Sequence, residues 1–323
     1  MPVSAMAVAA AESPATGPEP PVLLEAVTKH YGDRPVVHDL SLTVRPGESL
    51  VLVGHNGAGK TTLMKLILGL TRPTSGYIRS LGIDPAARSA AGVRGMIGYL
   101  PESVAFHEAM TGREVLRFYA RLKGEPVGHC ERLLDRVGLG GARNRRVSTY
   151  SKGMRQRLGL AQAMLGHPRL LLLDEPTTGL DPALRRYFYE IITELRDAGS
   201  TVLISSHALH EVEARADRIA IMRQGTLVAH GTLEELTARV RLPLRVFVRV
   251  ERGRGLELAK RLGGDLHVQH ADANSIEIRC LGTEKMAILR RMAALGEVVR
   301  DIDIVPPRLD DVYMHYMAGI QPQ

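Results

Sequence analysis

The run from Gly54 to Thr62 carries the most specific chemical pattern in the chain, G-x-x-x-x-G-K-[ST]. Glycines in this pattern let the backbone bend so that successive N–H groups point at one anion, beside a helix N-terminus. Lys60 is then expected to reach the β- and γ-phosphates of a nucleotide, and the Thr61 hydroxyl to bind Mg²⁺. The residues expected around the nucleotide are Gly54, His55, Asn56, Gly57, Ala58, Gly59, Lys60, Thr61 and Thr62. The alternative is a glycine turn that only caps a helix.

Two adjacent carboxylates, Asp174 and Glu175, follow the apolar run Leu170–Leu173. In nucleotide hydrolysis, Asp174 is expected to hold Mg²⁺ through its water shell, while Glu175 polarises the attacking water. A general base of this kind contributes roughly 10²–10⁴-fold to the rate. The alternative is that the pair only caps the next helix. A phosphate loop in the same chain favours the catalytic interpretation.

Two further groups could act on the nucleotide. His207 follows the apolar run Thr201–Ser205 and could sense the γ-phosphate through its imidazole, although a lone histidine is more often structural. Ser151 and Gly153 stand at the start of a predicted helix, where a hydroxyl, an N–H group and the helix dipole can together bind an anion. The alternative for Ser151 is a plain helix N-cap.

The elements around these groups alternate between strand and helix. Strands are predicted for Val22–Lys29, Ser41–Arg45, Leu50–Val53, Met96–Leu100, Leu170–Leu173 and Thr201–Ser205, and helices for Leu63–Leu68, Arg132–Val137, Ser151–Gly166 and Asp181–Ala198. This alternation predicts an α/β fold with a mainly parallel sheet, whose ligands bind at the carboxyl ends of the strands. Lys60, Asp174, Glu175 and His207 all fall at such ends, so we expect one site to contain them.

Another helix is predicted to begin at Thr111. Thr111 and Glu114 have the spacing of a capping box. Val115, Phe118, Tyr119 and Leu122 then recur at helical spacing and are expected to share one face.

After about Val240 the pattern changes. Strands are predicted for Leu244–Val250, Leu266–His270, Ser275–Cys280 and Val298–Val305, and helices for Leu256–Leu262 and Thr283–Leu295. The order βαββαβ predicts a ferredoxin-like α+β domain, which we expect to span residues 240–323 as an accessory domain.

Composition excludes several classes of protein. The 323 residues are 45% apolar and 24% charged, as in a soluble globular protein, and no run of about 18 apolar residues could span a membrane. The net charge is +7, but the basic residues are scattered and only 4% of residues are aromatic, so no nucleic-acid partner is expected.

The two cysteines are far apart, which favours a reducing cytosolic compartment. Residues 1–20 are predicted to form a disordered tail.

The order of the motifs resembles that of the ATP-binding cassette (ABC) ATPases. The motifs are the phosphate loop, Leu100-Pro101-Glu102, Tyr150 to Gln156 (YSKGMRQ), Leu170 to Pro176 (LLLLDEP), Gly179-Leu180-Asp181 and Ser205-Ser206-His207. The resemblance covers about residues 22–240. Two positions depart from the usual pattern: Glu102 stands in place of Gln, and Tyr-Ser-Lys-Gly-Met at 150–154 in place of Leu-Ser-Gly-Gly-Gln.

The resemblance implies a P-loop NTPase fold of the ABC ATPase type over residues 21–239, with a helical subdomain at about 102–166. It implies ATP and Mg²⁺ as cofactors, with Glu102 near the metal beside Thr61 and Asp174. It also implies a homodimer that encloses ATP, in which Ser151 and Gly153 of one subunit contact the ATP held by the other. Tyr31 would stack on adenine, Asp181 would bridge the subunits, and residues after Glu102 would meet an integral membrane permease subunit.

A narrower resemblance concerns Leu100–Gly124 and Tyr150–Gly166, which are similar to the ATPase subunit of the copper-processing transporter that matures nitrous oxide reductase. It implies a location at the cytoplasmic face of the bacterial inner membrane and a periplasmic copper-processing protein as a further partner. The alternatives are the ATPase of a drug or lipid exporter, and a soluble ABC ATPase that acts on ribosomes or DNA. The single set of motifs and the lack of sustained heptads disfavour the last of these.

Overall fold

The computed structural model describes residues 19–262 and 266–318 of the chain. The disordered tail predicted for residues 1–20 lies outside these ranges apart from Glu19 and Pro20. Among the described residues, none of the helices is both long and apolar enough to cross a lipid bilayer.

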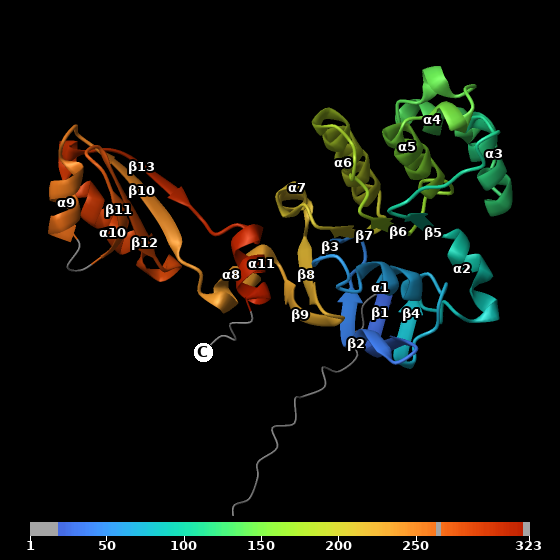
Figure 1. Cartoon of the computed structure of the whole chain (residues 1–323), viewed down its shortest axis with the longest axis horizontal. Coiled ribbons are helices and arrows are strands. Elements are labelled where there is room, and N and C mark those ends of the chain that lie inside the picture. Colours follow the sequence, from blue (N-terminus) through green and yellow to red (C-terminus); the bar gives the residue numbers. More distant parts are fainter. Residues whose placement is uncertain (1–18, 263–265, 319–323) are drawn as a thin grey trace, which may run out of the picture.

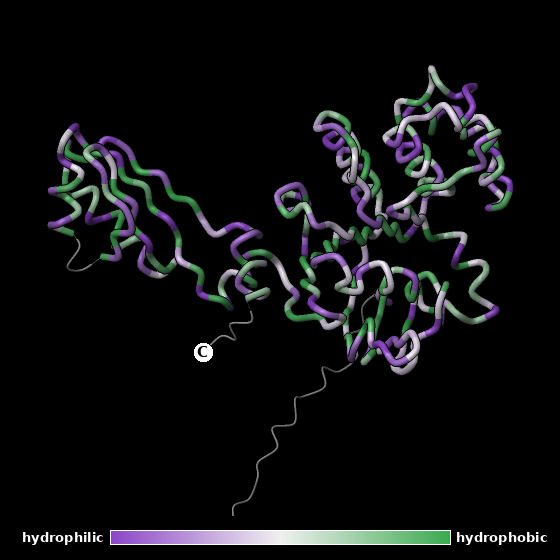
Figure 2. The backbone as a smooth tube through the Cα atoms, in the orientation of Figure 1, coloured by the Kyte–Doolittle hydropathy of each residue, from purple (hydrophilic) through white to green (hydrophobic). Residues whose placement is uncertain are grey.

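The N-terminal domain is built on a six-stranded sheet in the order β5-β6-β7-β3-β8-β9. Its strands are β3 (Ser49–Val53), β5 (Ile97–Leu100), β6 (Leu170–Asp174), β7 (Thr201–Ser206), β8 (Arg218–Arg223) and β9 (Thr226–Gly231). Neighbouring strands are parallel except β8 and β9. Every residue of β3, β6 and β7 is buried, so these strands form the apolar centre of the domain (Figure 2). The mainly parallel sheet predicted from the sequence is confirmed.

The two faces of this sheet bury different cores, because successive side chains of a strand point to opposite faces. From β3, Leu50 and Leu52 face the first core, which also contains α1 (Lys60–Ile67). A three-stranded antiparallel sheet closes this core, with β1 (Val22–Tyr31) between β2 (Arg34–Val44) and β4 (Ser75–Ser80). The first core therefore holds β3 and α1, the two elements that flank the phosphate loop, against each other.

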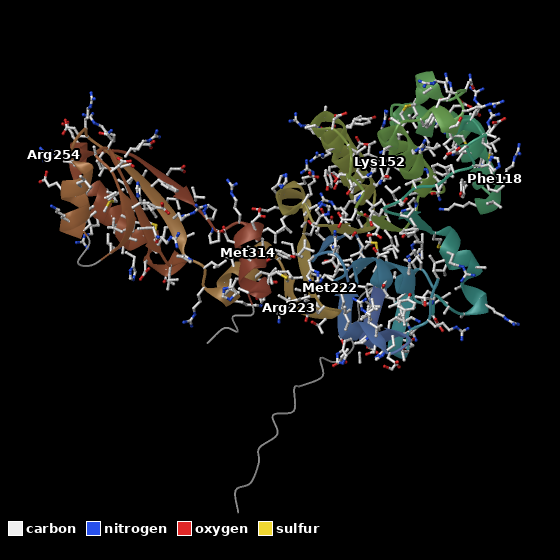
Figure 3. All side chains as sticks on the ribbon, in the orientation of Figure 1. Phe118, Lys152, Met222, Arg223, Arg254 and Met314 are labelled. Carbon is white, nitrogen blue, oxygen red and sulfur yellow. The ribbon has the colours of Figure 1, made fainter. Side chains whose placement is uncertain are left out.

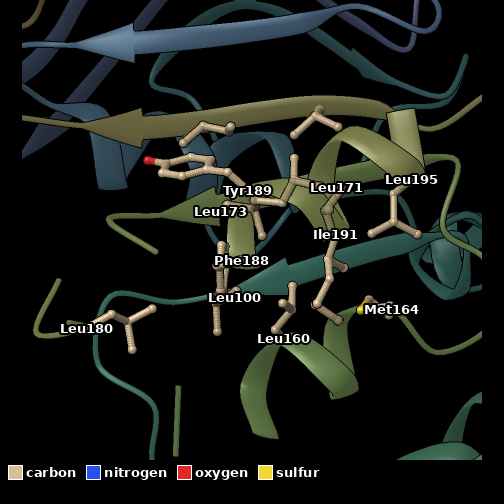
Figure 4. Packing of buried hydrophobic residues seen from close by; sticks show 14 of the residues in the cluster. Leu100, Leu160, Met164, Leu171, Leu173, Leu180, Phe188, Tyr189, Ile191 and Leu195 are labelled. Atoms are coloured by element: carbon tan, nitrogen blue, oxygen red, sulfur yellow. The ribbon is translucent and has the colours of Figure 1, made fainter. Parts of the chain in front are cut away.

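Helices form the second core on the other face (Figures 1 and 4). They are α3 (Gly112–Lys123), α4 (His129–Arg136), α5 (Lys152–Ala163) and α6 (Pro182–Asp197), while α2 (Ala91–Gly95) precedes β5, and α7 (Leu209–Val212) and α8 (Leu233–Val240) follow β7 and β9. The capping box predicted for Thr111 and Glu114 is confirmed at the start of α3. Asp181 caps α6 by accepting a hydrogen bond from the Leu184 N–H at 2.9 Å.

The residues predicted to share one face of α3 are divided by the fold. Val115 is buried and Tyr119 is half-buried, whereas Phe118 and Leu122 are 49% and 67% exposed. Leu116 and Ala120 turn inwards in their place. Figure 3 shows Phe118 at the outer edge of the helical layer.

A second antiparallel sheet follows α8 and has its own core. The elements are β10 (Leu244–Val250), α9 (Gly255–Leu262), β11 (His267–Ala271), β12 (Ser275–Cys280), α10 (Lys285–Ala293) and β13 (Val299–Val305). The order in space is β11-β12-β10-β13. The predicted strands and helices of this region are confirmed to within a few residues.

The last helix, α11 (Leu309–Met317), does not pack on this sheet but returns to the N-terminal domain (Figure 1). Leu309 and Val312 are fully buried in the same core as Leu209 and Val212 of α7. The Glu213 carboxylate accepts a hydrogen bond from the Leu309 N–H at 3.2 Å. An accessory domain over all of 240–323 is therefore not what the packing shows, because the apolar face of α11 completes the core of the N-terminal domain.

Candidate functional site

The loop between β3 and α1 requires glycine at two positions. Gly59 has a φ of 103°, and a Cβ there would lie 2.6 Å from the Val36 carbonyl oxygen. A Cβ on Gly54 would lie 2.6 Å from the Met222 carbonyl oxygen. Both contacts are shorter than any real Cβ contact, so the surrounding backbone selects glycine. The loop thereby presents its N–H groups beside the N-terminus of α1.

Lys60 lies at the centre of the site, and its side chain is only 7% exposed. The ammonium donates hydrogen bonds to the carbonyl oxygens of Gly54 at 2.5 Å and His55 at 3.4 Å. It also lies 3.5 Å from Oε1 of Glu175. A buried ammonium needs such partners, and an anion entering the loop would find this charge already in place.

Asp174 is the last residue of β6, and its two carboxylate oxygens differ in their hydrogen bonding. Oδ1 accepts a hydrogen bond from the Ser205 hydroxyl of β7 at 2.5 Å. Oδ2 is buried and has no hydrogen-bond partner within the described part of the chain. A buried carboxylate oxygen without a donor is costly, so it favours a cation or a bound water at this point.

Glu175 holds a left-handed backbone conformation, with a φ of 46°. Its N–H group donates to the carbonyl oxygen and the hydroxyl of Ser205, at 3.2 and 3.0 Å. Its carboxylate lies between Lys60 and His207, whose Nδ1 is 2.7 Å from Oε2. Strained residues that the surrounding structure holds in place are concentrated at functional sites. Lys60, Asp174, Glu175 and His207 are thus brought together, as their positions at strand ends led us to expect.

A cavity of about 290 Å³ opens at this edge of the sheet. It is lined by Val36, His55, Asn56, Gly57, Ala58, Gly59, Lys60, Thr61, Thr62, Glu102, Asp174 and Glu175. All but Val36 were candidate site residues from the sequence. Val36 follows the turn after β1 and carries no pattern that could have marked it.

The other candidates lie outside the cavity. Tyr31 is 49% exposed at the end of β1, with the Lys29 ammonium 5.0 Å from its ring centre. His207 reaches the site only through Glu175. Their expected roles at adenine and at the γ-phosphate stay predictions.

Ser151, Gly153 and Asp181 lie together on a different surface. Ser151 caps α5 by accepting a hydrogen bond from the Met154 N–H at 3.2 Å, and it is exposed. A Cβ on Gly153 would lie 3.3 Å from Leu180, the residue before Asp181. None of the three residues lines the cavity at the phosphate loop of the same subunit.

Ser205 is the functional residue that the sequence analysis left without a role. It is completely buried and binds both Asp174 and Glu175. The motif Ser205-Ser206-His207 drew attention only to the histidine, although a serine at the end of a neighbouring parallel strand was the available signal.

Comparisons with known proteins agree with this geometry. A family model described as ABC transporter matches residues 37–178. The chain is 34% identical over 304 residues to the Nod factor export ATP-binding protein I of Rhizobium etli, covering 89% of this chain and 90% of that protein. It is 35% identical over 220 residues to the linearmycin resistance ATP-binding protein LnrL of Bacillus subtilis, covering 67% and 70%. A solved structure described as the ATP binding subunit of an ABC transporter matches with a TM-score of 0.63 and 32% identity, covering 67% and 92%.

Proposed function

The chain belongs to the ABC transporter family as an ATP-binding subunit whose ATP hydrolysis is coupled to transport, and we propose that it drives export through a separate membrane protein. While export is supported by the relative named for Nod factor export, the observation that carries the ATP-hydrolysing part of this function is the cavity that joins Lys60, Asp174 and Glu175. These are the groups that phosphoryl chemistry requires: a phosphate-binding cation, a metal-binding carboxylate and a base.

The residues present fit Mg²⁺. The buried Oδ2 of Asp174 has no other partner among the described residues, and the cavity also contains the Thr61 side chain and Glu102. Oxygen ligands of this kind are those that Mg²⁺ prefers, together with water and phosphate oxygens. When bound, the metal would neutralise negative charge on the phosphates.

The chain's own residues then have distinct tasks. The N–H groups of the loop after β3 hold the phosphates, and the Lys60 ammonium binds their oxygens. Glu175 accepts a proton from the attacking water, and His207 keeps the Glu175 carboxylate in position from the side away from Lys60.

Ser151, Gly153 and Asp181 belong in this proposal to the dimer. Their location at the exposed ends of α5 and α6, away from their own cavity, supports a homodimer in which they face the partner's nucleotide. A serine hydroxyl at a helix N-terminus is a suitable phosphate ligand for such an arrangement.

The permease is proposed to dock on α3. Phe106, which follows Glu102, is half-buried, with its ring centre 6.1 Å from that of Tyr119, so it does not offer an exposed anchor. Phe118 and Leu122 are the exposed apolar side chains on this helix, and large apolar groups on a surface commonly mark an interface. We propose, on this basis, that the protein is a peripheral subunit at the cytoplasmic face of a membrane.

The accessory sheet supports a ferredoxin-like assignment, because its βαββαβ order and antiparallel pairing match that arrangement. We propose that it regulates or strengthens dimerisation, since neither its own core nor its strands contribute to the nucleotide cavity.

For the cargo we propose an organic molecule, because two relatives are named for Nod factor export and linearmycin resistance. A second candidate is copper-site maturation of nitrous oxide reductase, which the stretches Leu100–Gly124 and Tyr150–Gly166 favour. A strain without this protein decides between them. Nitrous oxide reductase with its full copper complement contradicts the copper candidate, and a deficient enzyme contradicts the organic-export candidate.

The direct test of the hydrolytic site is Glu175→Gln. We expect hydrolysis to fall by roughly 10²–10⁴-fold, because the base is lost while the side-chain shape is kept. ATP binding should remain, and ATP should hold two copies together in gel filtration. Hydrolysis at the wild-type rate would remove Glu175 from its role as base.

A further inference from the structure

Glu211 is a largely buried carboxylate outside the nucleotide cavity. It lies on α7, four residues after His207, and its side chain is 11% exposed. A carboxylate buried to this extent must be paired, because an unpaired buried charge is strongly destabilising. Nε2 of His210, on the same helix, lies 3.9 Å from Oε1 of Glu211, and the shorter contacts of Glu211 come from two other segments.

The first partner lies just after the proposed base. Oε2 of Glu211 accepts a hydrogen bond from the Thr177 hydroxyl at 3.0 Å. Thr177 is in the turn that begins at Glu175, where the Thr178 N–H donates to the Glu175 carbonyl oxygen at 3.3 Å. Glu211 therefore holds this turn through the Thr177 hydroxyl.

The second partner is Arg185 of α6, whose guanidinium forms an ion pair with Oε1 of Glu211. The Nε of Arg185 also donates to the carbonyl oxygen of Leu180 at 2.8 Å. Leu180 precedes Asp181, so the same guanidinium ties Glu211 to the segment that we propose faces the second subunit.

The contacts close a ring around the proposed base. His207 lies 2.7 Å from Glu175, the chain continues through α7 to Glu211, and Glu211 returns to Thr177. Every link is a hydrogen bond or a short stretch of chain. A shift of α7 would consequently move His207 and the Glu175 turn together.

Arg215 and Tyr189 lie next to Glu211 on the side of the second core. The backbone carbonyl of Glu211 accepts a hydrogen bond from Arg215 at 2.7 Å, and the Arg215 guanidinium lies 4.5 Å from the ring centre of Tyr189. Burial, with the Glu211 carboxylate nearby, raises the pKa of Tyr189 to about 12. Figure 4 shows Tyr189 and Leu180 among the buried residues of the second core. Polar contacts in such low-dielectric surroundings are stronger than at the surface.

We propose that Glu211 is a positioning residue for ATP hydrolysis. It fixes the position of Glu175 relative to His207 and links both residues to the Leu180–Asp181 segment. This inference rests on the proposed function, since it assumes that Glu175 is the base. Glu211 does not touch the nucleotide cavity and acts through Thr177, Arg185 and α7.

The test compares Glu211→Ala and Glu211→Gln with Glu190→Gln, which changes an exposed carboxylate on α6. We expect kcat to fall roughly ten- to hundredfold in Glu211→Ala, because small misplacements of catalytic groups cost rates of this order. The Glu211→Gln variant should fall less, since an amide oxygen can still accept from Thr177. KM for ATP and nucleotide binding should stay within about twofold in both, and Glu190→Gln should behave as wild type.

A second measurement separates positioning from general stability. In a Glu175→Gln background, Glu211→Ala should cause no further loss of kcat, because there is no base left to position. An unchanged kcat in Glu211→Ala, or parallel loss of kcat, ATP binding and thermal stability, would overturn the inference. Normal hydrolysis in Glu175→Gln would instead contradict the proposed function, whatever Glu211→Ala does.

Discussion

At the scale of single residues, the site combines a strained backbone at Glu175 with a carboxylate oxygen of Asp174 that lacks a hydrogen-bond partner among the described residues. Glu175 keeps a φ of 46°, although only glycine adopts this region freely, because Ser205 holds its N–H group from β7. Oδ2 of Asp174 stays without a partner in the described structure. Both features cost stability, and residues of this kind are concentrated at functional sites.

Glu102 provides a prediction at this scale. It lines the cavity with Asp174, where a carboxylate can accept hydrogen bonds from metal-bound water. We expect Glu102→Ala to lower kcat roughly ten- to hundredfold and to raise the Mg²⁺ concentration needed for half-maximal hydrolysis, since one charge-assisted hydrogen bond is worth about 1.5–3 kcal/mol. Glu102→Gln should keep most of the activity, and EDTA should abolish it in all variants.

The Glu102 measurement is a Mg²⁺ titration of hydrolysis, with nucleotide binding followed by a fluorescent ATP analogue. If Glu102→Ala loses ATP affinity to the same extent as it loses hydrolysis, Glu102 acts in nucleotide binding and the metal assignment is wrong.

At the scale of elements, α11 is the clearest departure from a division into two consecutive domains. It follows the accessory sheet in sequence, but its Leu309 and Val312 complete the core beneath α7. Since α7 follows His207 directly, the last helix of the chain supports an element of the nucleotide site. Arg223 of β8 adds a hydrogen bond to the Tyr316 carbonyl oxygen at 3.1 Å.

We therefore expect Leu309→Ala to destabilise the N-terminal domain by about 2–5 kcal/mol, the usual range for a buried leucine. Met314→Ala changes a side chain of α11 that is 64% exposed, so it should have little effect and serves as the control. Thermal unfolding followed by circular dichroism measures both. Equal stability of the two variants would mean that α11 does not pack on this core in solution.

At the scale of the whole molecule, the nucleotide site and the proposed docking surface lie at different parts of the N-terminal domain. The cavity opens at the strand ends, whereas Phe118 and Leu122 lie on the outer helical layer (Figures 1 and 3). α5 packs against both α3 and β5, so it connects the two regions. Because no residue is shared between the cavity and the exposed face of α3, a mutation can affect docking without affecting hydrolysis.

We expect Phe118→Asp to abolish assembly with the membrane subunit while basal hydrolysis by the purified protein is kept. An apolar anchor at an interface centre commonly contributes about 2 kcal/mol or more, which is roughly a thirtyfold loss of affinity. Leu256→Asp, which alters an exposed leucine of the accessory domain, is the matched control. Co-purification from membranes measures assembly, and a Phe118→Asp protein that still co-purifies would exclude this face of α3.

Local sequence determined much of this protein. The phosphate loop, the buried strands, the cap of α3 and the positions of Lys60, Asp174 and Glu175 at strand ends all follow from short-range patterns, because backbone geometry and hydrogen bonding within a few residues are sufficient to set them. Sheet topology then brings strand ends together by rule, which is why one site could be expected.

Other features of the molecule depend on contacts made in the folded chain. The return of α11, the exposure of Phe118 and the pairing of Glu211 with Thr177 and Arg185 depend on contacts between segments that are far apart in the chain. An apolar helix face does not specify which core it will complete, and a carboxylate does not specify its partner. The physical reason is that burial and charge pairing depend on which surfaces meet in the folded chain, and no local periodicity records that choice.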